Sequence, residues 1–211
     1  MDEPTVDPLS PRESLQLITR QQDRAHRTFS NDPLVYWVPW GIAWLIGFGV
    51  FFLHYGLDGS PYVAMPAALP LIVLFGLMLA AAAWTVYTVI RSTRHIQGPG
   101  NVQVTVFGLS WPFGFLTVIS ICTYFRDFIP GDQIGLLWAG LSMGIAGVLY
   151  MAGAAIFQIR SMFVLGVWIT VVNMIGITAG PGWHALLTSV AGGGGMLLAA
   201  LWLRMRARSR S

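Results

Sequence analysis

The sequence has no lysine and little charge of either sign. Charged residues make up 10% of its 211 residues and hydrophobic residues 55%, whereas a soluble domain has roughly 25% charged residues. A soluble fold so poor in charge would have little with which to solvate its surface. The scarcity excludes an ordinary soluble domain and indicates a protein in lipid, where a charge at mid-bilayer costs several kcal/mol.

Cysteine is almost absent as well. The one cysteine, Cys122, lies in an apolar run, which excludes an intramolecular disulfide and a cysteine-based metal site and favours a buried apolar role. All twelve cationic residues among lysine and arginine are arginine, which we interpret as the codon bias of a GC-rich bacterial genome. The net charge of +3 comes mostly from the C-terminal tail, and it predicts no nucleic-acid partner.

Six apolar runs make up most of the remaining chain. Each approaches the roughly 20 residues that a helix needs to cross about 30 Å of hydrocarbon. The predicted fold class is therefore all-α, a polytopic membrane helical bundle with six transmembrane helices. Pro39, Pro70 and Pro112 fall inside these spans and should bend their helices. The expected transmembrane domain covers residues 33–203, with spans at about 33–55, 63–90, 102–125, 133–159, 161–178 and 184–203.

A cytoplasmic segment, residues 1–32, is expected before the first span, and it has no apolar core of a signal peptide. Ser10-Pro11-Arg12-Glu13 is a capping box that predicts an amphipathic helix at about 11–28. Two interpretations of this helix stay open: contact with anionic lipid, or a helix that is solvated or packs on the protein's own loops. The contact with lipid would be made by three arginines that share one stripe, Arg20, Arg24 and Arg27.

Arginine is distributed unequally between the two sides that six spans define. Every arginine except Arg126 falls in the N-terminal segment, in the loops after the second and fourth spans, or in the basic tail at 204–211. This is a strong positive-inside bias. We therefore expect a multi-pass protein of a bacterial plasma (inner) membrane with both termini in the cytoplasm. The arginines at 204–210 are further candidates for contact with anionic lipid.

Two spans share the pattern Gly-aliphatic-small-Trp-x-x-Gly-Phe, which predicts an internal repeat. It runs from Gly41 to Phe48 in the first span and from Gly108 to Phe115 in the third, and Gly166-Val167-Trp168 is a degraded version in the fifth. The unit would be a helical hairpin used three times, related by an axis along the membrane normal. Chance recurrence is the alternative. The even spans also end alike, at Ile90-Arg91, Ile159-Arg160 and Leu203-Arg204.

The sixth span contains a full turn of glycine, Gly192–Gly195. Three interpretations of this turn stay open: close packing within the chain, a hinge or unwound segment lining a site, and an oligomer contact. Four tryptophans lie deep in the spans and are expected to pack between helices: Trp44, Trp84, Trp111 and Trp168.

Residues that carry chemistry are scarce. We expect no Asp, Glu, Lys, Arg or His in the middle of any span, although ion-coupled transporters, proton pumps and membrane proteases usually need such groups. Asn173 is the one amide expected deep in the bilayer, as an interhelical hydrogen bond or a substrate ligand. We predict no catalytic, cofactor-binding or metal-binding residues. The metal-ligand types expected on the outer side have no supporting spacing: His54, Asp58, Asp127, Asp132 and His184.

The run Glu13–Ile18 with Gln21-Gln22, followed by Asp32-Pro33 and Trp40–Phe48, resembles a group of uncharacterised six-span membrane proteins of actinobacteria. Members of that group are sometimes labelled transporter or permease. The resemblance covers most of the chain and implies no established activity.

This sequence supports three functional hypotheses. The first is a non-enzymatic, transport-associated protein, either a small permease or the membrane partner of a transporter, and its basis is the repeated hairpins, the prolines in the spans and the glycine-rich span. The alternative is a membrane scaffold or sensor that binds a protein partner through the N-terminal helix. An intramembrane enzyme is the third, and the missing acids and bases disfavour it. A homo-oligomer is compatible with all three.

Overall fold

The structure is a computed structural model of the chain that describes residues 10, 12, 33–93 and 99–208. Contacts divide the chain into two units, residues 1–31 and 32–211. The expected helix at 11–28, with Arg20, Arg24 and Arg27, lies outside the described residues apart from Arg12. The second unit contains every candidate membrane span of the described chain.

The described part of the second unit is helical, without a strand, and it contains six helices long and apolar enough to cross a membrane. The protein is therefore an all-α, multi-pass membrane bundle, as the apolar runs predict. The sixth span joins three consecutive elements, with a π-helix between two α-helices. The elements are α2 (Pro33–Tyr55), α3 (Ala68–Thr93), α4 (Pro99–Phe125), α5 (Gly131–Phe157), α6 (Arg160–Ala179), α7 (Pro181–Leu187), η1 (Thr188–Gly194) and α8 (Gly195–Arg208).

The second span begins later than the sequence indicates, at Ala68. Tyr62 and Val63 donate their backbone N–H groups to the Leu53 carbonyl oxygen, at 3.0 and 3.2 Å, and so belong to the connection after α2. Pro70 consequently lies in the first turn of α3, where an N–H has no intrahelical acceptor to lose. The expectation that Pro70 would bend its helix was wrong, because that expectation needs proline in the helix interior.

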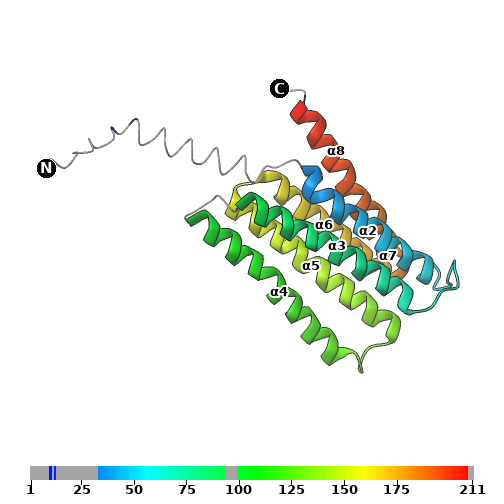
Figure 1. The fold of residues 1–211 in the computed structure, drawn as a ribbon. Helices are drawn as coiled ribbons and strands as arrows, with labels where there is room; N and C mark the ends of the chain where they lie inside the picture. The colour runs from blue at the N-terminus through cyan, green and yellow to red at the C-terminus, as the bar shows by residue number, and fades with distance from the viewer. Residues whose placement is uncertain (1–9, 11, 13–32, 94–98, 209–211) are drawn as a thin grey trace. The chain divides into compact units, whose positions relative to one another are not determined.

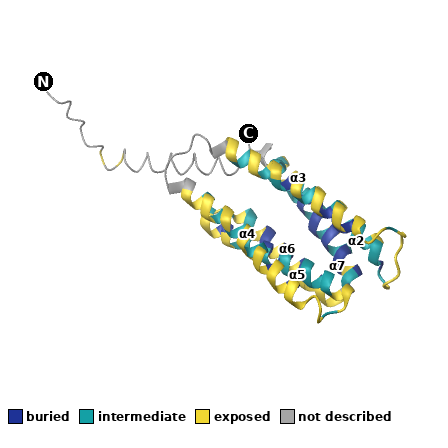
Figure 2. Cartoon of the chain, turned by 60° about the horizontal axis from the view of Figure 1, so that its bottom comes forward, coloured by how far each residue is buried: buried dark blue, intermediate teal, exposed yellow. Residues whose placement is uncertain are grey.

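Neighbouring helices pack on one another in a series. α3 packs on α2, α2 packs along the whole sixth span, the sixth span packs on α6, α6 packs on α5, and α5 packs on α4. Figure 2 shows α3 beside α2, and α4 on the other side of the bundle with α5 and α6. The helices α3 and α4 are consecutive in sequence, yet they are the two ends of the series, and neither makes its main contacts with the other.

The hairpin repeat agrees with these contacts, because the two helices of each hairpin pack on each other. A Cβ added at Gly47 of α2 would lie 2.5 Å from the Leu74 side chain of α3. A Cβ at Gly114, the matching glycine of α4, would lie 2.9 Å from the Ile145 side chain of α5. Both glycines therefore face the second helix of their own hairpin, which favours repetition over chance.

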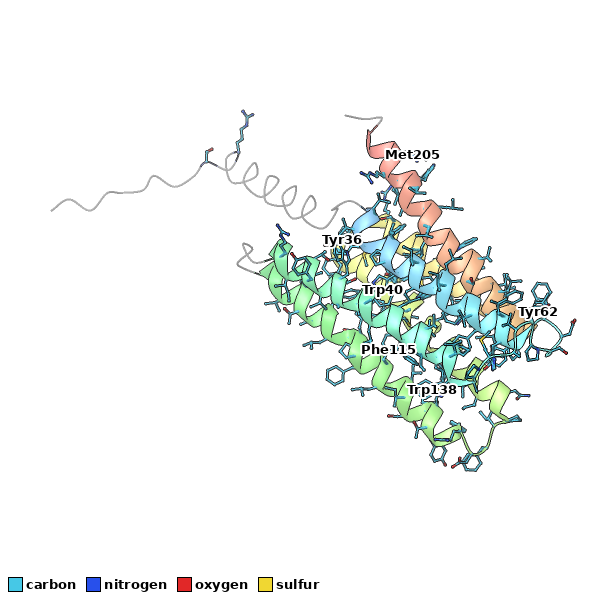
Figure 3. The ribbon with its side chains drawn as sticks, turned by 45° about the vertical axis from the view of Figure 1, so that its right-hand side comes forward. Tyr36, Trp40, Tyr62, Phe115, Trp138 and Met205 are labelled. Carbon is cyan, nitrogen blue, oxygen red and sulfur yellow. The ribbon has the colours of Figure 1, made fainter. Side chains whose placement is uncertain are left out.

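Tryptophan side chains join the helices by hydrogen bonds as well as by packing. Figure 3 labels Trp40 on α2. Its indole N–H donates to Thr85 Oγ1 of α3 at 3.0 Å, and the Trp84 indole N–H donates back to the Val35 carbonyl oxygen of α2 at 3.0 Å. Trp84 and Trp168 are both about half exposed, so the expectation that they pack between helices is met only in part. The Trp168 indole N–H donates to the Ala191 carbonyl oxygen in η1 at 2.8 Å. Each bond satisfies a polar group that lipid could not satisfy.

The core lies where α2, α5, α6 and the sixth span meet. Cys122 is buried on α4, as its apolar surroundings predict. The outward faces of the spans carry exposed apolar side chains, as expected of helices whose solvent is lipid. The main cluster of buried apolar side chains consists of Trp44, Phe48, Leu74, Met143, Leu165, Ile169, Val172 and Met196.

Candidate functional site

The sixth span changes from α-helix to π-helix over Thr188–Gly194. π-helical turns are rare and frequently lie at functional sites. The last three residues of the segment, Gly192–Gly194, have no side chains and low helix propensity. A regular α-helix is therefore weakly favoured here, and the backbone can take the wider turn.

The four glycines of this turn have different surroundings. A Cβ added at Gly193 would collide with the Leu45 amide nitrogen of α2 and lie 2.7 Å from the Gly41 carbonyl oxygen. A Cβ at Gly192 would lie 3.1 Å from the Trp44 ring, whereas a Cβ at Gly194 would meet no described atom within 4 Å. Close packing within the chain is therefore confirmed for Gly193, where the backbones of α2 and η1 touch.

Four polar side chains are buried beside the π-helical turn: Asn173 of α6, His184 of α7, and Thr188 and Ser189 of η1. The Asn173 Nδ2 group donates to the Gly140 carbonyl oxygen of α5 at 2.8 Å. Its Oδ1 atom lies 2.9 Å from Nε2 of His184. Because the amide nitrogen donates to Gly140, the amide oxygen is the acceptor, and Nε2 of His184 carries the shared proton. The expected interhelical hydrogen bond of Asn173 is confirmed.

The two hydroxyl groups extend the cluster to other helices. The Ser189 hydroxyl donates to the Leu45 carbonyl oxygen of α2 at 2.6 Å. The Thr188 hydroxyl donates to Met143 Sδ of α5 at 3.3 Å. Together with the amide and the imidazole, these bonds connect α2, α5, α6 and the sixth span. We call these four side chains, Asn173, His184, Thr188 and Ser189, the polar cluster.

Glycine also makes room for the imidazole of His184. A Cβ at Gly176 of α6 would lie 2.8 Å from Cδ2 and 3.0 Å from Cα of His184. On the opposite helix, the Phe48 ring lies 6.3 Å from the imidazole, edge to face. The imidazole is therefore enclosed by α2 and α6, and only 2% of His184 is exposed.

One hydrogen-bond donor near the polar cluster is unpaired. The Trp44 indole N–H is buried and has no partner among the described residues, and only 5% of Trp44 is exposed. Its ring packs edge to face on Phe48, with 5.9 Å between ring centroids. An unsatisfied buried donor costs about 1–3 kcal/mol. The core of the bundle thus holds an N–H group without a hydrogen-bond acceptor among the described residues.

A serine, a histidine and an asparagine can form a nucleophilic triad when serine donates to the imidazole. Here the single hydroxyl proton of Ser189 goes to the Leu45 carbonyl oxygen. The imidazole of His184 donates instead to Asn173. The hydrogen bonds of Ser189 and His184 therefore join helices, and the serine hydroxyl is not paired with the imidazole as a nucleophile with its base.

The side chains expected on the outer side do not gather, as far as the structure describes them. His54 lies in the last turn of α2, Asp58 in the connection to α3, and Asp127 between α4 and α5, where it faces Arg126 at 3.9 Å on an exposed surface. Over the described residues, no three side chains of the metal-ligand types come together. His184 is buried, because the sixth span begins three residues before the expected residue 184, at Pro181.

Sequence reasoning identified Asn173 but missed its partners and the two hydroxyl groups. The sequence contained a signal for the two hydroxyl groups, because Thr188 and Ser189 lie four and three residues before Gly192, the first glycine of the turn. Polar side chains one turn from a glycine run lie on the surface that the glycines open to a neighbouring helix.

Comparisons of the chain with protein-family models, with curated proteins and with solved structures find no match. No relative therefore assigns a role to the polar cluster or to η1. Their role has to be inferred from the geometry and chemistry of the residues themselves.

Proposed function

We propose that this multi-pass membrane protein acts in transport, as a small permease or as the membrane partner of a transporter, without a catalytic step of its own. The observation that carries the proposal is the polar cluster beside a π-helical turn inside a membrane span. Polar side chains within the bilayer are costly, and those that occur there often mark a substrate pathway. Transporters commonly bind substrates beside irregular turns of their spans.

The depth of the polar cluster fits this role. Thr188 and Ser189 come seven and eight residues after the start of α7 at Pro181, which corresponds to roughly 10–12 Å along a helix. The hydroxyls therefore lie well inside the hydrocarbon region and away from both ends of the span. A solute that reaches this depth would meet hydroxyl, amide and indole N–H groups of neutral charge.

The contacts also indicate how the sixth span could move. Within η1, its contacts with α2 include a side-chain hydrogen bond from Ser189 to Leu45 and the packing of Gly193 against the α2 backbone. A substrate that competes for the Leu45 carbonyl oxygen or binds the Trp44 N–H would favour a different arrangement of these helices.

Flux into liposomes tests the proposal. We expect purified protein to carry at least one solute class among sugars, amino acids, aromatic compounds and organic cations faster than protein-free liposomes. Ser189→Ala should reduce that flux about tenfold, equivalent to about 1.4 kcal/mol, because it removes the bond between η1 and α2. Ser120→Ala is the matched control, since the exposed Ser120 hydroxyl bonds only to Leu116 of its own helix.

Two results together would contradict the proposal. The first is flux equal to that of protein-free liposomes for every solute class. The second is purification of the protein from its native membrane without any transporter subunit. The first result alone leaves the role of membrane partner, and the second alone leaves the role of permease.

We further propose that the protein resides in a bacterial plasma membrane with both termini in the cytoplasm, and that it belongs with the actinobacterial group it resembles. In a Cys122→Ala background, Asp127→Cys should react with a membrane-impermeant maleimide in intact cells. Arg206→Cys should react only after permeabilisation, because arginine segments stay inside. Both parent side chains are exposed, so access does not limit the reaction. Labelling of Arg206→Cys in intact cells would show that the orientation is reversed.

A further inference from the structure

The three hairpins contact one another through one type of interface. We number them by their helices: the first is α2 with α3, the second α4 with α5, and the third α6 with the sixth span. At each interface, the first helix of one hairpin packs on the second helix of another. Thus α2 packs on the sixth span, and α6 packs on α5. A third interface of the same type would join α4 to α3. Within the described chain, these two helices are the ends of the series.

A glycine of the first helix lies at each of the two interfaces that exist, although Gly166 is one residue closer to its tryptophan than Gly41 is. A Cβ at Gly41 of α2 would lie 3.1 Å from the Gly193 carbonyl oxygen and 2.9 Å from Leu197 of the sixth span. A Cβ at Gly166 of α6 would lie 2.7 Å from the Gly147 carbonyl oxygen and 2.9 Å from the Met151 amide nitrogen of α5. In both, the first helix meets a glycine carbonyl oxygen and the residue four positions later.

The corresponding glycine of the second hairpin is Gly108, which holds the position of Gly41 in the shared pattern. A Cβ at Gly108 would meet no described atom within 4 Å. Glycine lowers the stability of a helix. In membranes this loss is commonly offset because another helix can pack closely on the glycine. Gly108 is thus the residue type found at a helix–helix interface, yet no helix among the described residues packs on it.

The complementary surface is present on α3. The arginines at which the even spans end, Arg91, Arg160 and Arg204, give a common reference for position along these spans. The contacting glycines Gly147 and Gly193 lie 13 and 11 residues before their arginines. The equivalent level of α3, counted back from Arg91, is residues 78 to 80. Exposed small residues lie at this level on one face of α3, Gly76, Ala80 and Ala83, and a Cβ at Gly76 would also meet no described atom within 4 Å.

We infer that the exposed faces of α3 and α4 bind a second copy of this chain, with α4 of one copy packed on α3 of the other through Gly108. Each copy carries both halves of the interface, so a two-fold axis along the membrane normal forms two such contacts. All copies share one orientation in the membrane, and α4 then meets the partner's α3 antiparallel, as α2 meets the sixth span. The inference does not rest on the transport proposal.

Cross-linking between differently tagged copies tests the inference. In a Cys122→Ala background, one copy carries Gly108→Cys and the other carries Ala80→Cys, and the two are expressed together. We expect oxidation in native membranes to give a disulfide-linked dimer with both tags. Val148→Cys with Leu198→Cys is the matched control pair, since both side chains are exposed and lie on α5 and α8, outside the proposed contact between α3 and α4. The mixed-tag product should exceed that of the control pair about tenfold.

Two outcomes of the cross-linking would overturn the inference. A disulfide that forms only when both cysteines are in one chain would mean that α3 and α4 close on each other. Absence of any mixed-tag product above the control would mean that lipid alone, or another protein, covers these helices.

Gly108→Leu gives an independent test at a position where an added Cβ would meet no described atom within 4 Å, so the fold should tolerate the substitution. We expect its thermal stability in detergent to match that of wild type. Its dimer fraction, counted by photobleaching steps of labelled protein in liposomes, should fall at least about fivefold. An equal dimer fraction in both proteins, or wild-type protein that is monomeric in liposomes, would overturn the inference.

Discussion

Gly193→Ala should lower the free energy of unfolding by about 3 kcal/mol or more, the upper end of the range for overpacking. The added methyl group would collide with the Leu45 amide nitrogen and approach the Gly41 carbonyl oxygen. Both are backbone atoms of α2, so no side-chain rotation can relieve the collision and the helices must separate. Their separation would also strain the bond from Ser189 to Leu45.

Gly194→Ala is the matched control for this prediction. Its methyl group would meet no described atom within 4 Å, and alanine favours a helix by about 1 kcal/mol over glycine. We therefore expect stability equal to or above that of wild type. The loss of monodisperse protein after heating in detergent, quantified by size-exclusion chromatography, measures both variants. Equal losses for the two would show that η1 does not contact α2 through Gly193.

Asn173→Ala and His184→Ala should each lower the free energy of unfolding by about 1–2 kcal/mol, and the double variant by less than the sum. The Asn173→Ala substitution removes two hydrogen bonds and leaves the imidazole N–H of His184 unpaired in the core. His184→Ala removes the same shared bond together with its packing on Phe48. A double-mutant cycle isolates the shared bond, which we expect to contribute roughly 0.6–1.7 kcal/mol, the range found within membranes.

Thr178→Ala provides the control for the cycle. Thr178 lies on α6 like Asn173, but its exposed hydroxyl bonds only to carbonyl oxygens of its own helix. Its effect should add to that of His184→Ala within a few tenths of a kcal/mol. Reversible unfolding in mixed micelles supplies the free energies. Additive effects of Asn173→Ala and His184→Ala would mean that the bond between them is not formed.

The spans could be predicted because length and hydropathy determine them. The bounds of α2 match the expected 33–55, and the last residues of α4 and α6 are within one residue of those expected. The start of α3 could not be predicted in this way. Tyr62 and Val63 are apolar enough for a span, and only their bonds to the Leu53 carbonyl oxygen show that the chain turns back there.

The polar cluster was predictable only in part, for a related reason. A lone amide in an apolar run indicates an interhelical hydrogen bond, and Asn173 makes one. Its partners, Gly140 and His184, come from two other helices, and the hydropathy of the sequence does not determine which helices are neighbours. The glycine run indicates a weak helix, but the close contact of Gly193 with the α2 backbone depends on which helices are neighbours, and local propensity does not determine that.

The pairing of the first span with the last sets a condition on biosynthesis. Ser189 and its acceptor Leu45 are 144 residues apart, which at roughly 5–20 residues per second takes the ribosome roughly 7–30 s. During that interval, the side of α2 that carries Gly41 lacks the helix on which it packs in the finished bundle. A chaperone of the insertion machinery, or lipid, must occupy that side until translation of the final span ends.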